Sequence, residues 1–226
     1  MGWDLPKCLL PCPGGTLLDN TLGALSSRGV SRIAIVVGYK REHVEAAVGK
    51  QALTVDFLVN ADYATTNTLH SLHLARELLR EGALYFNGDV WFSEPAIDAL
   101  RNNGRDDSTL LIVQRKCGLE EVKAVVSAEG RVRRIGKDLA PESAAGEFIG
   151  MARFAAPTGA ALADDLERCI NDEASATRFF EFSLNHILDA HSVRAAFVDS
   201  VDAIELDTPQ DYDTARQLWS KPPEPQ

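Results

Sequence analysis

Hydrophobic and polar residues along this chain are arranged in blocks that predict strands and helices in turn. Apolar residues at helical spacing predict a helix over Leu17–Ser27, and the short apolar run Ile33–Val37 predicts a buried strand. In the same way, helices are predicted at Arg41–Val48, Asn67–Leu79 and Pro95–Asn102, and strands at Thr54–Val59, Leu84–Phe86 and Thr109–Gln114. Such alternation implies crossover connections and a mostly parallel sheet that is covered on both sides. We therefore expect an α/β fold: a three-layer sandwich with a Rossmann-like central sheet.

The pattern changes after Gln114. The runs Val122–Ser127 and Val132–Ile135, joined by a turn at Glu129-Gly130, predict a small antiparallel hairpin. The remaining elements are strands at Phe148–Phe154, Arg194–Asp199 and Ala203–Leu206, and helices at about 158–171, at about 178–190 and at Pro209–Trp219. Because no internal repeat or linker interrupts the pattern, we expect one domain over residues 1–219, followed by a Pro-rich tail at 220–226 that is typical of a disordered linker.

Composition narrows the possible partners of the chain. Its 226 residues carry a net charge of −10, which argues against a general binder of nucleic acid or anionic membranes. The four cysteines show neither paired zinc spacing nor a secreted disulfide framework. No signal peptide opens the sequence, and no apolar run approaches a membrane-spanning length. We expect a cytoplasmic protein.

Carboxylates follow two distant apolar strands. Ala83–Phe86 runs into Asn87-Gly88-Asp89, and Ala203-Ile204 runs into Glu205-Leu206-Asp207. Ligands bind at the carboxyl ends of strands in open parallel sheets, and Mg²⁺ takes oxygen ligands together with substrate phosphates. We predict that Asp89 and Asp207 bind Mg²⁺, and that Glu205, on the same face of its strand as Asp207, ligates it or forms a nearby hydrogen bond. The alternatives are a turn role for Asp89 and an N-cap role for Asp207.

An ordered set of fragments resembles one enzyme family. The fragments are Pro6–Pro11, Gly14–Leu18, Ile35–Lys40, Asn60-x-x-Tyr63-x-x-x-Asn67-x-x-x-Ser71-Leu72, Asn87–Asp89, Gly146–Gly150, Phe180-Glu181 and Glu205–Pro209. Their order resembles that of nucleotidyltransferases that make nucleotide-activated sugars and alcohols. Within that family, the similarity is greatest to bacterial choline-phosphate and phosphonate cytidylyltransferases. It spans essentially residues 4 to 219.

The resemblance implies roles for further residues. By position, Lys7 is similar to the lysine that contacts the nucleotide phosphates, and Asn67, Ser71 and Gly88 are similar to residues near the nucleotide. It also implies that one of Lys123 and Lys137, with Lys123 favoured, faces the acceptor's phosphoryl group. By the same resemblance, Glu147 contacts a cationic or hydroxyl-bearing substrate and Glu181 a cationic head group. The structural alternatives are solvated hairpin lysines, a strand-entry charge at Glu147, and a capping arrangement at Asn67 and Ser71.

The chain departs from this family at its beginning. Family members start with a central strand and a Gly-rich loop of the form G-x-G-x-R, but this sequence begins at Met1–Leu5, where that loop should already be ending. Such a loop cradles nucleotide phosphates, and its arginine neutralises the leaving pyrophosphate. We expect a late-called start or a shortened sequence rather than a natural deletion. The absent strand would leave unpaired backbone groups inside the sheet.

The resemblance implies a Mg²⁺-dependent transfer of a nucleotidyl group, with CTP favoured as donor, to a small phosphate or phosphonate monoester. The acceptor is already an anion, so no general base is required. One alternative is an inactive nucleotide- or sugar-phosphate-binding module that regulates a partner; another is a sugar-1-phosphate nucleotidyltransferase that uses a different base. The Phe-rich stretch at 179–182 would serve a homodimer as easily as a pocket.

Overall fold

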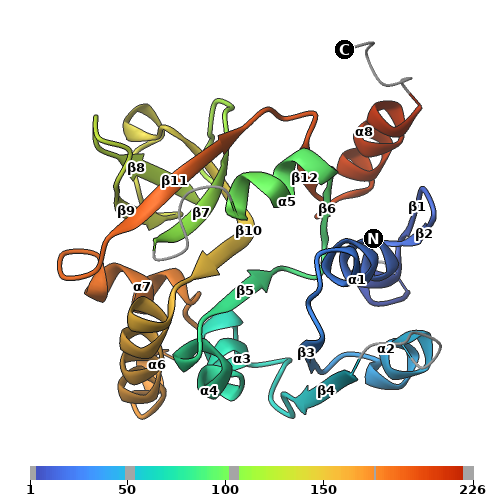
Figure 1. Ribbon diagram of the computed structural model, residues 1–226, viewed down its shortest axis with the longest axis horizontal. Coiled ribbons are helices and arrows are strands. Elements are labelled where there is room, and N and C mark those ends of the chain that lie inside the picture. The colour runs from blue at the N-terminus through green and yellow to red at the C-terminus, as the bar shows by residue number, and fades with distance from the viewer. Residues whose placement is uncertain (1–3, 49–53, 102–106, 176, 221–226) are drawn as a thin grey trace.

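The computed structural model describes residues 4–48, 54–101, 107–175 and 177–220 of the chain (Figure 1). Its largest sheet has six strands. They are β5 (Ala83–Phe86), β7 (Ser108–Val113), β8 (Lys123–Val126), β9 (Val132–Gly136), β10 (Gly146–Phe154) and β11 (Val193–Val198). Five of them follow the order β11-β7-β10-β8-β9, and β5 pairs with the carboxyl-terminal half of β10. The prediction of an α/β fold with a small antiparallel hairpin, here β8 and β9, is confirmed.

Helices cover both faces of this sheet. Every side chain of β7 is buried, and alternate residues of the strand belong to different cores. Leu110 and Ile112 pack with α3 (Thr68–Leu74), α4 (Arg76–Arg80), α6 (Ala156–Ile170) and α7 (Glu181–Ile187). Leu111 and Val113 pack with α1 (Leu17–Ser27) and α5 (Glu94–Arg101) on the other face (Figure 1). The period of two along one strand therefore produces the three layers.

Strand β10 interrupts the parallel arrangement of the sheet. It runs antiparallel to β5, β7 and β8, whereas β11 is parallel to β7. As a result, β5, β7 and β11 point the same way, and β10 runs against them. The nine residues of β10 contain the whole fragment Gly146–Gly150, including the predicted site residue Glu147, and carry it into the middle of the sheet.

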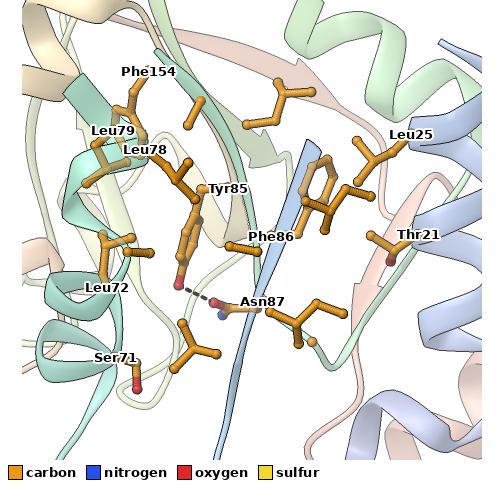
Figure 2. A pocket seen from close by; sticks show the side chains of 18 of the residues that line it. Thr21, Leu25, Ser71, Leu72, Leu78, Leu79, Tyr85, Phe86, Asn87 and Phe154 are labelled. Carbon is orange, nitrogen blue, oxygen red and sulfur yellow. Dashed lines mark hydrogen bonds between the residues drawn. The ribbon is translucent and has the colours of Figure 1, made fainter. Parts of the chain in front are cut away.

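Strand β3 (Arg32–Val37) forms a separate parallel pair with β4 (Thr54–Val59). Among the described residues β3 has no second strand partner, and β5 has none besides β10. A groove with a volume of about 1200 Å³ separates β3 from β5, and we call it the β3–β5 groove. Its walls are mainly apolar (Figure 2) and include Leu22, Leu25, Ile33, Ile35, Leu72, Leu79, Leu84 and Phe86. Unpaired strand edges were expected inside the sheet, and these two edges face the groove.

Most helix bounds agree with the sequence-based prediction. Helices α1, α2 (Arg41–Val48) and α8 (Pro209–Trp219) have the predicted limits. The predicted helix over Asn67–Leu79 is instead two short helices, α3 and α4, which meet at Ala75. There the backbone leaves the helical region (φ −96°, ψ 7°), and no Gly or Pro marks the break in the sequence. Among the described helices, none has the length and apolar character to cross a membrane.

The sequence pattern did not predict three short strands. It also did not predict three 3-10 turns, which are η1 (Lys7–Leu9), η2 (Pro141–Ser143) and η3 (Glu173–Ser175). Strands β1 (Pro11–Cys12) and β2 (Gly15–Thr16) form a small antiparallel pair before α1. Strand β6 (Val90–Phe92) pairs antiparallel with β12 (Ala203–Glu205). The β6–β12 pair joins two segments that are more than a hundred residues apart in the sequence, and it builds the site described below.

Candidate active site

The β6–β12 pair brings two predicted acidic segments together. Val90 lies opposite Glu205, so Asp89 and Leu206 are neighbours across the next step of the pair. The backbone N–H of Leu206 donates a hydrogen bond to the carbonyl of Asp89 over 2.9 Å. The acids therefore converge through an antiparallel pairing, whereas the sequence analysis had placed them at the ends of parallel strands.

Lys7 lies between two carboxylates of this site. It begins η1, and its Nζ is 2.6 Å from Oδ1 of Asp207 and 3.1 Å from Oδ2 of Asp89. Burial alone would lower the pKa of Lys7, but the two carboxylates outweigh that effect and raise it. The lysine is therefore a stable cation at the centre of the acidic group.

Glu205 completes a cluster of three acids. One carboxylate oxygen from each of Asp89, Glu205 and Asp207 lies within 4.8 Å of the others. Burial, reinforced by the charges of Asp89 and Asp207, raises the pKa of Glu205 to about 8. A group of hard oxygen donors that repel one another fits a divalent ion such as Mg²⁺, which would relieve the repulsion. The predicted ligand set is therefore geometrically compatible with a metal.

Asn87 contacts Glu205, and no role for Asn87 was predicted from the sequence. Its side chain accepts a hydrogen bond from the hydroxyl of Tyr85 over 2.5 Å (Figure 2) and donates one to Glu205 over 3.4 Å. Asn87 packs on Gly150, whose φ of 81° and closeness to the amide leave no room for a Cβ. Two features of the sequence could have indicated this contact: an Asn directly before Gly88, and a glycine, Gly150, inside a predicted strand.

Eight of the eleven predicted site residues line a single cavity with a volume of about 530 Å³. They are Lys7, Asn67, Gly88, Asp89, Lys137, Glu181, Glu205 and Asp207. The cavity also shares Cys8, Thr68, Asn87 and Gly88 with the β3–β5 groove, so the two spaces are continuous. Asn67 caps α3, since its side chain accepts a hydrogen bond from the backbone N–H of Thr68. Asn67 therefore both caps α3 and lines the cavity.

The Glu181 side of the cavity combines charge with aromatic rings. Glu181 is only 7% exposed, and within the described part of the chain its Oε2 has no hydrogen-bond partner. Burial raises its pKa to about 7. The ammonium of Lys137 lies 5.2 Å from the centre of the Phe179 ring, a cation–π distance. This side of the cavity offers a carboxylate, an ammonium and ring faces to a small ligand.

Three predicted site residues lie outside this cavity. Ser71 faces the β3–β5 groove (Figure 2) and accepts a hydrogen bond from Asn60. Lys123 is fully buried and donates to three backbone carbonyls, those of Gly118, Leu119 and Glu121, so the structure gives it a structural role and does not place it on the acceptor side of the cavity. Glu147 is also buried and pairs with Arg115 over 2.5 Å. Burial raises the pKa of Glu147 to about 7 although Arg115 opposes the shift.

The N-cap of α8 is Thr208, not Asp207. The Thr208 hydroxyl accepts from the backbone N–H of Asp211, and the Asp211 carboxylate accepts from the backbone N–H of Thr208. Asp207 is one residue earlier, and its side chain is left for Lys7. The alternative N-cap role for Asp207 therefore falls to the next residue, Thr208.

Comparison with known proteins identifies the family. The family model described as "MobA-like NTP transferase domain" matches residues 1–188, most of the chain. The chain belongs to this family. The prediction that the sequence is a member of a nucleotidyltransferase family is therefore confirmed.

Named relatives of this MobA-like domain include two phosphonate enzymes. It is 45% identical over 94 residues to the "CMP-5'-(3-aminopropyl)phosphonate synthase" of Streptomyces rubellomurinus, a match that covers 41% of the chain and 15% of that protein. It is 26% identical over 207 residues to the "2-aminoethylphosphonate cytidylyltransferase" of Lancefieldella rimae, covering 88% and 80% of the two chains. The MobA-like domain thus spans only a small part of the first relative.

A solved structure shares the fold. The CTP:phosphocholine cytidylyltransferase of Streptococcus pneumoniae superposes with a TM-score of 0.78 at 22% identity, covering 95% of this chain and 90% of that chain. This similarity supports the same α/β architecture in both proteins.

Proposed function

We propose that this MobA-like domain transfers a cytidylyl group from CTP to a small phosphate or phosphonate monoester and releases pyrophosphate. The observation that carries the proposal is the convergence of Lys7, Asp89, Glu205 and Asp207 on one cavity. Three acids around one lysine suit a site that binds a metal–triphosphate complex, because the positive charges of metal and lysine together neutralise the phosphates.

In the proposed reaction, an oxygen of the acceptor's phosphoryl group attacks the α-phosphorus of CTP in line. A new P–O bond forms as the bond to the β-phosphate breaks, and the electron pair leaves with pyrophosphate. The attacking oxygen is already anionic, so no residue needs to remove a proton. The residues therefore act by holding the two reactants in line and by neutralising charge.

Each group of the cavity has a proposed part in this reaction. Asp89 and Asp207 would hold Mg²⁺, with Glu205 as third ligand, and the ion would neutralise charge on the triphosphate. Lys7 exchanges its contacts with Asp89 and Asp207 for contacts with phosphate oxygens. Asn67 and Gly88 line the same cavity, and we assign them contacts with the nucleotide.

The acceptor is proposed to be an aminoalkylphosphonate or a similar phosphomonoester that carries a cationic group. Glu181 supplies a buried carboxylate without a hydrogen-bond partner at Oε2 in the described structure, which suits an ammonium. The printed names of both phosphonate relatives contain an aminoalkylphosphonate. Lys137 and the ring of Phe179 lie on the same side of the cavity and would contact the acceptor's phosphoryl group and its alkyl chain.

Replacement of Asp89 tests the proposal. With CTP, Mg²⁺ and 2-aminoethylphosphonate, we expect wild-type protein to release pyrophosphate and Asp89→Asn to lose at least about 100-fold in rate while keeping its melting temperature. Asp164→Asn is the matched control, because Asp164 also pairs with a cation, Arg80, but on the surface. An Asp89→Asn variant as active as the wild type would refute the assignment.

The same samples separate the alternatives. Calorimetry with CTP and Mg²⁺ that detects binding without pyrophosphate release would favour the regulatory binding module. Faster release with UTP, GTP or dTTP than with CTP would favour a transferase that uses another base.

A further inference from the structure

A second polar cluster lies between α6 and α7, and none of its residues lines the candidate active site. Asp165 and Cys169 come from α6, one helical turn apart and on one face, and both are buried. Ser183 and His186 come from α7, and the side chain of His186 is 36% exposed. Of these four side chains, only that of His186 is substantially exposed.

One carboxylate oxygen of this cluster has more hydrogen-bond donors around it than it has lone pairs. Oδ2 of Asp165 lies 2.7 Å from the Ser183 hydroxyl, 2.9 Å from Nδ1 of His186 and 3.4 Å from Sγ of Cys169. A carboxylate oxygen has about two lone pairs, so three hydrogen-bond donors compete for them. A cation in place of the Cys169 and His186 protons removes this competition and leaves the Ser183 hydrogen bond intact.

The spacing of the three donor atoms fits a zinc ion. The donor atoms of Asp165, Cys169 and His186 all lie within 4.8 Å of one another. Zinc bonds of about 2.3 Å to sulfur and about 2.0 Å to nitrogen or oxygen, at tetrahedral angles, require S···O of about 3.5 Å and N···O of about 3.3 Å. The observed distances of 3.4 Å and 2.9 Å are within a few tenths of an ångström of these values.

The chemistry of the donors also favours zinc over magnesium. A soft thiolate and a borderline imidazole beside one carboxylate suit zinc. The acidic centre, which consists of Asp89, Glu205 and Asp207, offers only hard carboxylate oxygens. The other oxygen of Asp165 accepts from Arg168, which orients the carboxylate as a second-sphere partner does in many metal sites. Arg168 also reaches within 3.3 Å of Nδ1 of His186, but its side chain is 68% exposed and can turn into solvent.

We propose that Asp165, Cys169 and His186 bind a zinc ion that fastens α7 to α6, with water as the fourth ligand. The ion replaces the thiol proton, which passes to solvent. It also takes the place of the Nδ1 proton, and Nε2 carries the proton instead, so that the imidazole stays neutral. Helix α7 begins at Glu181, which lines the active-site cavity, so zinc would also hold the helix that presents this carboxylate.

Titration with Co²⁺ tests the thiolate ligand directly. The reduced full-length chain should develop a thiolate-to-cobalt charge-transfer band that saturates at one ion per chain and disappears when Zn²⁺ is added. We expect Cys169→Ser to lose the band and Cys117→Ser, which alters another free cysteine, to keep it. The band should also persist in Asp89→Asn, which disables the acidic centre. Absence of the band in wild-type protein, or its persistence in Cys169→Ser, would overturn the proposal.

Thermal unfolding provides a second readout that does not depend on Cys169. Zinc at about 100 times its Kd should raise the melting temperature of a domain of this length by about 5–10 °C. His186→Gln preserves a side chain that can donate a hydrogen bond to Asp165 but is a poor zinc ligand, so its zinc-induced shift should fall below about 2 °C. An equal shift in wild-type and His186→Gln protein would contradict a site built on His186.

Discussion

Lys7 and Lys123 show how differently two lysines can be held in one molecule. Lys7 is held by two carboxylates and its side chain is 34% exposed, so in the proposed reaction phosphate oxygens take the place of those partners. Lys123 is fully buried and its ammonium is surrounded by three carbonyls of the loop that precedes β8. Carbonyls in a folded loop cannot move away as side chains can. A lysine with exchangeable anionic partners is suited to binding, and a lysine among fixed carbonyls is suited to holding a loop.

Replacement of Lys7 should have the largest effect on activity. We expect Lys7→Gln to reduce kcat/KM for CTP by about 100- to 1000-fold, because a positive charge that meets the triphosphate is lost. Its melting temperature should stay within a few degrees of the wild type. Lys40→Gln is the control, because Lys40 also pairs with a carboxylate, Asp4, over 2.6 Å. Equal kinetic losses in both variants would mean that the contrast is one of net charge only.

Replacement of Lys123 should instead reduce stability. Lys123→Met leaves three loop carbonyls without their donor, and we expect the free energy of unfolding to fall by about 2–4 kcal/mol. Chemical denaturation measures this loss. Below the melting transition, kcat/KM should remain within about threefold of the wild type. A stable Lys123→Met protein with strongly reduced activity would reverse the roles assigned to the two lysines.

Glu181 differs from both lysines, because it is a buried carboxyl group whose Oε2 has no hydrogen-bond partner among the described residues. Its pKa is raised from 4.5 to about 7 by burial, so between these values the folded protein retains a proton that the unfolded chain has released. This contribution to stability is complete below about pH 4.5 and is lost as the pH rises through about 7. We expect Glu181→Gln to be more stable than wild type by about 2 kcal/mol at pH 8, and the difference to vanish near pH 4.5. A difference independent of pH, measured by denaturation across this range, would exclude the mechanism.

The smallest predicted effect concerns the cap beside Asp207. Thr208→Ala removes the capping box of α8 and should cost about 1 kcal/mol of stability. Because Asp207 is the preceding residue and contacts Lys7, we also expect a few-fold rise in the Mg²⁺ concentration needed for half-maximal activity. Thr16→Ala is a matched control, since Thr16 and Asp19 form the same capping box on α1. It should lower stability by a similar amount and leave the Mg²⁺ dependence unchanged.

The elements with strong local signals could be predicted from the sequence. Helix α1 has leucines on one face and is followed by Gly29, and α8 begins at Pro209, so their bounds follow from local chemistry. Strand β6 has only three residues, too few for a periodic signal, and its partner β12 is more than a hundred residues away. The fold class was therefore predictable, but the pairing that assembles the acidic centre was not.

The same distinction applies to the site residues. Asp89 and Asp207 stand out because each follows an apolar run, and both line the cavity. Lys123 and Lys137 look alike in the sequence, since both flank the hairpin. Only the folded hairpin shows that Lys123 turns into the loop at Gly118–Glu121 while Lys137 reaches the cavity. The direction of a side chain at the end of a strand depends on tertiary packing, which no local pattern records.

The β3–β5 groove has a consequence for the behaviour of the protein at high concentration. Each of its two facing strands presents backbone donors and acceptors without a strand partner in the described structure, next to apolar walls. An extended apolar peptide that enters between them gains two ladders of hydrogen bonds at once, which makes the groove a template for adventitious strand addition. We therefore expect colloidal stability at high protein concentration to depend on whether this groove is filled, even in samples whose acidic centre is intact.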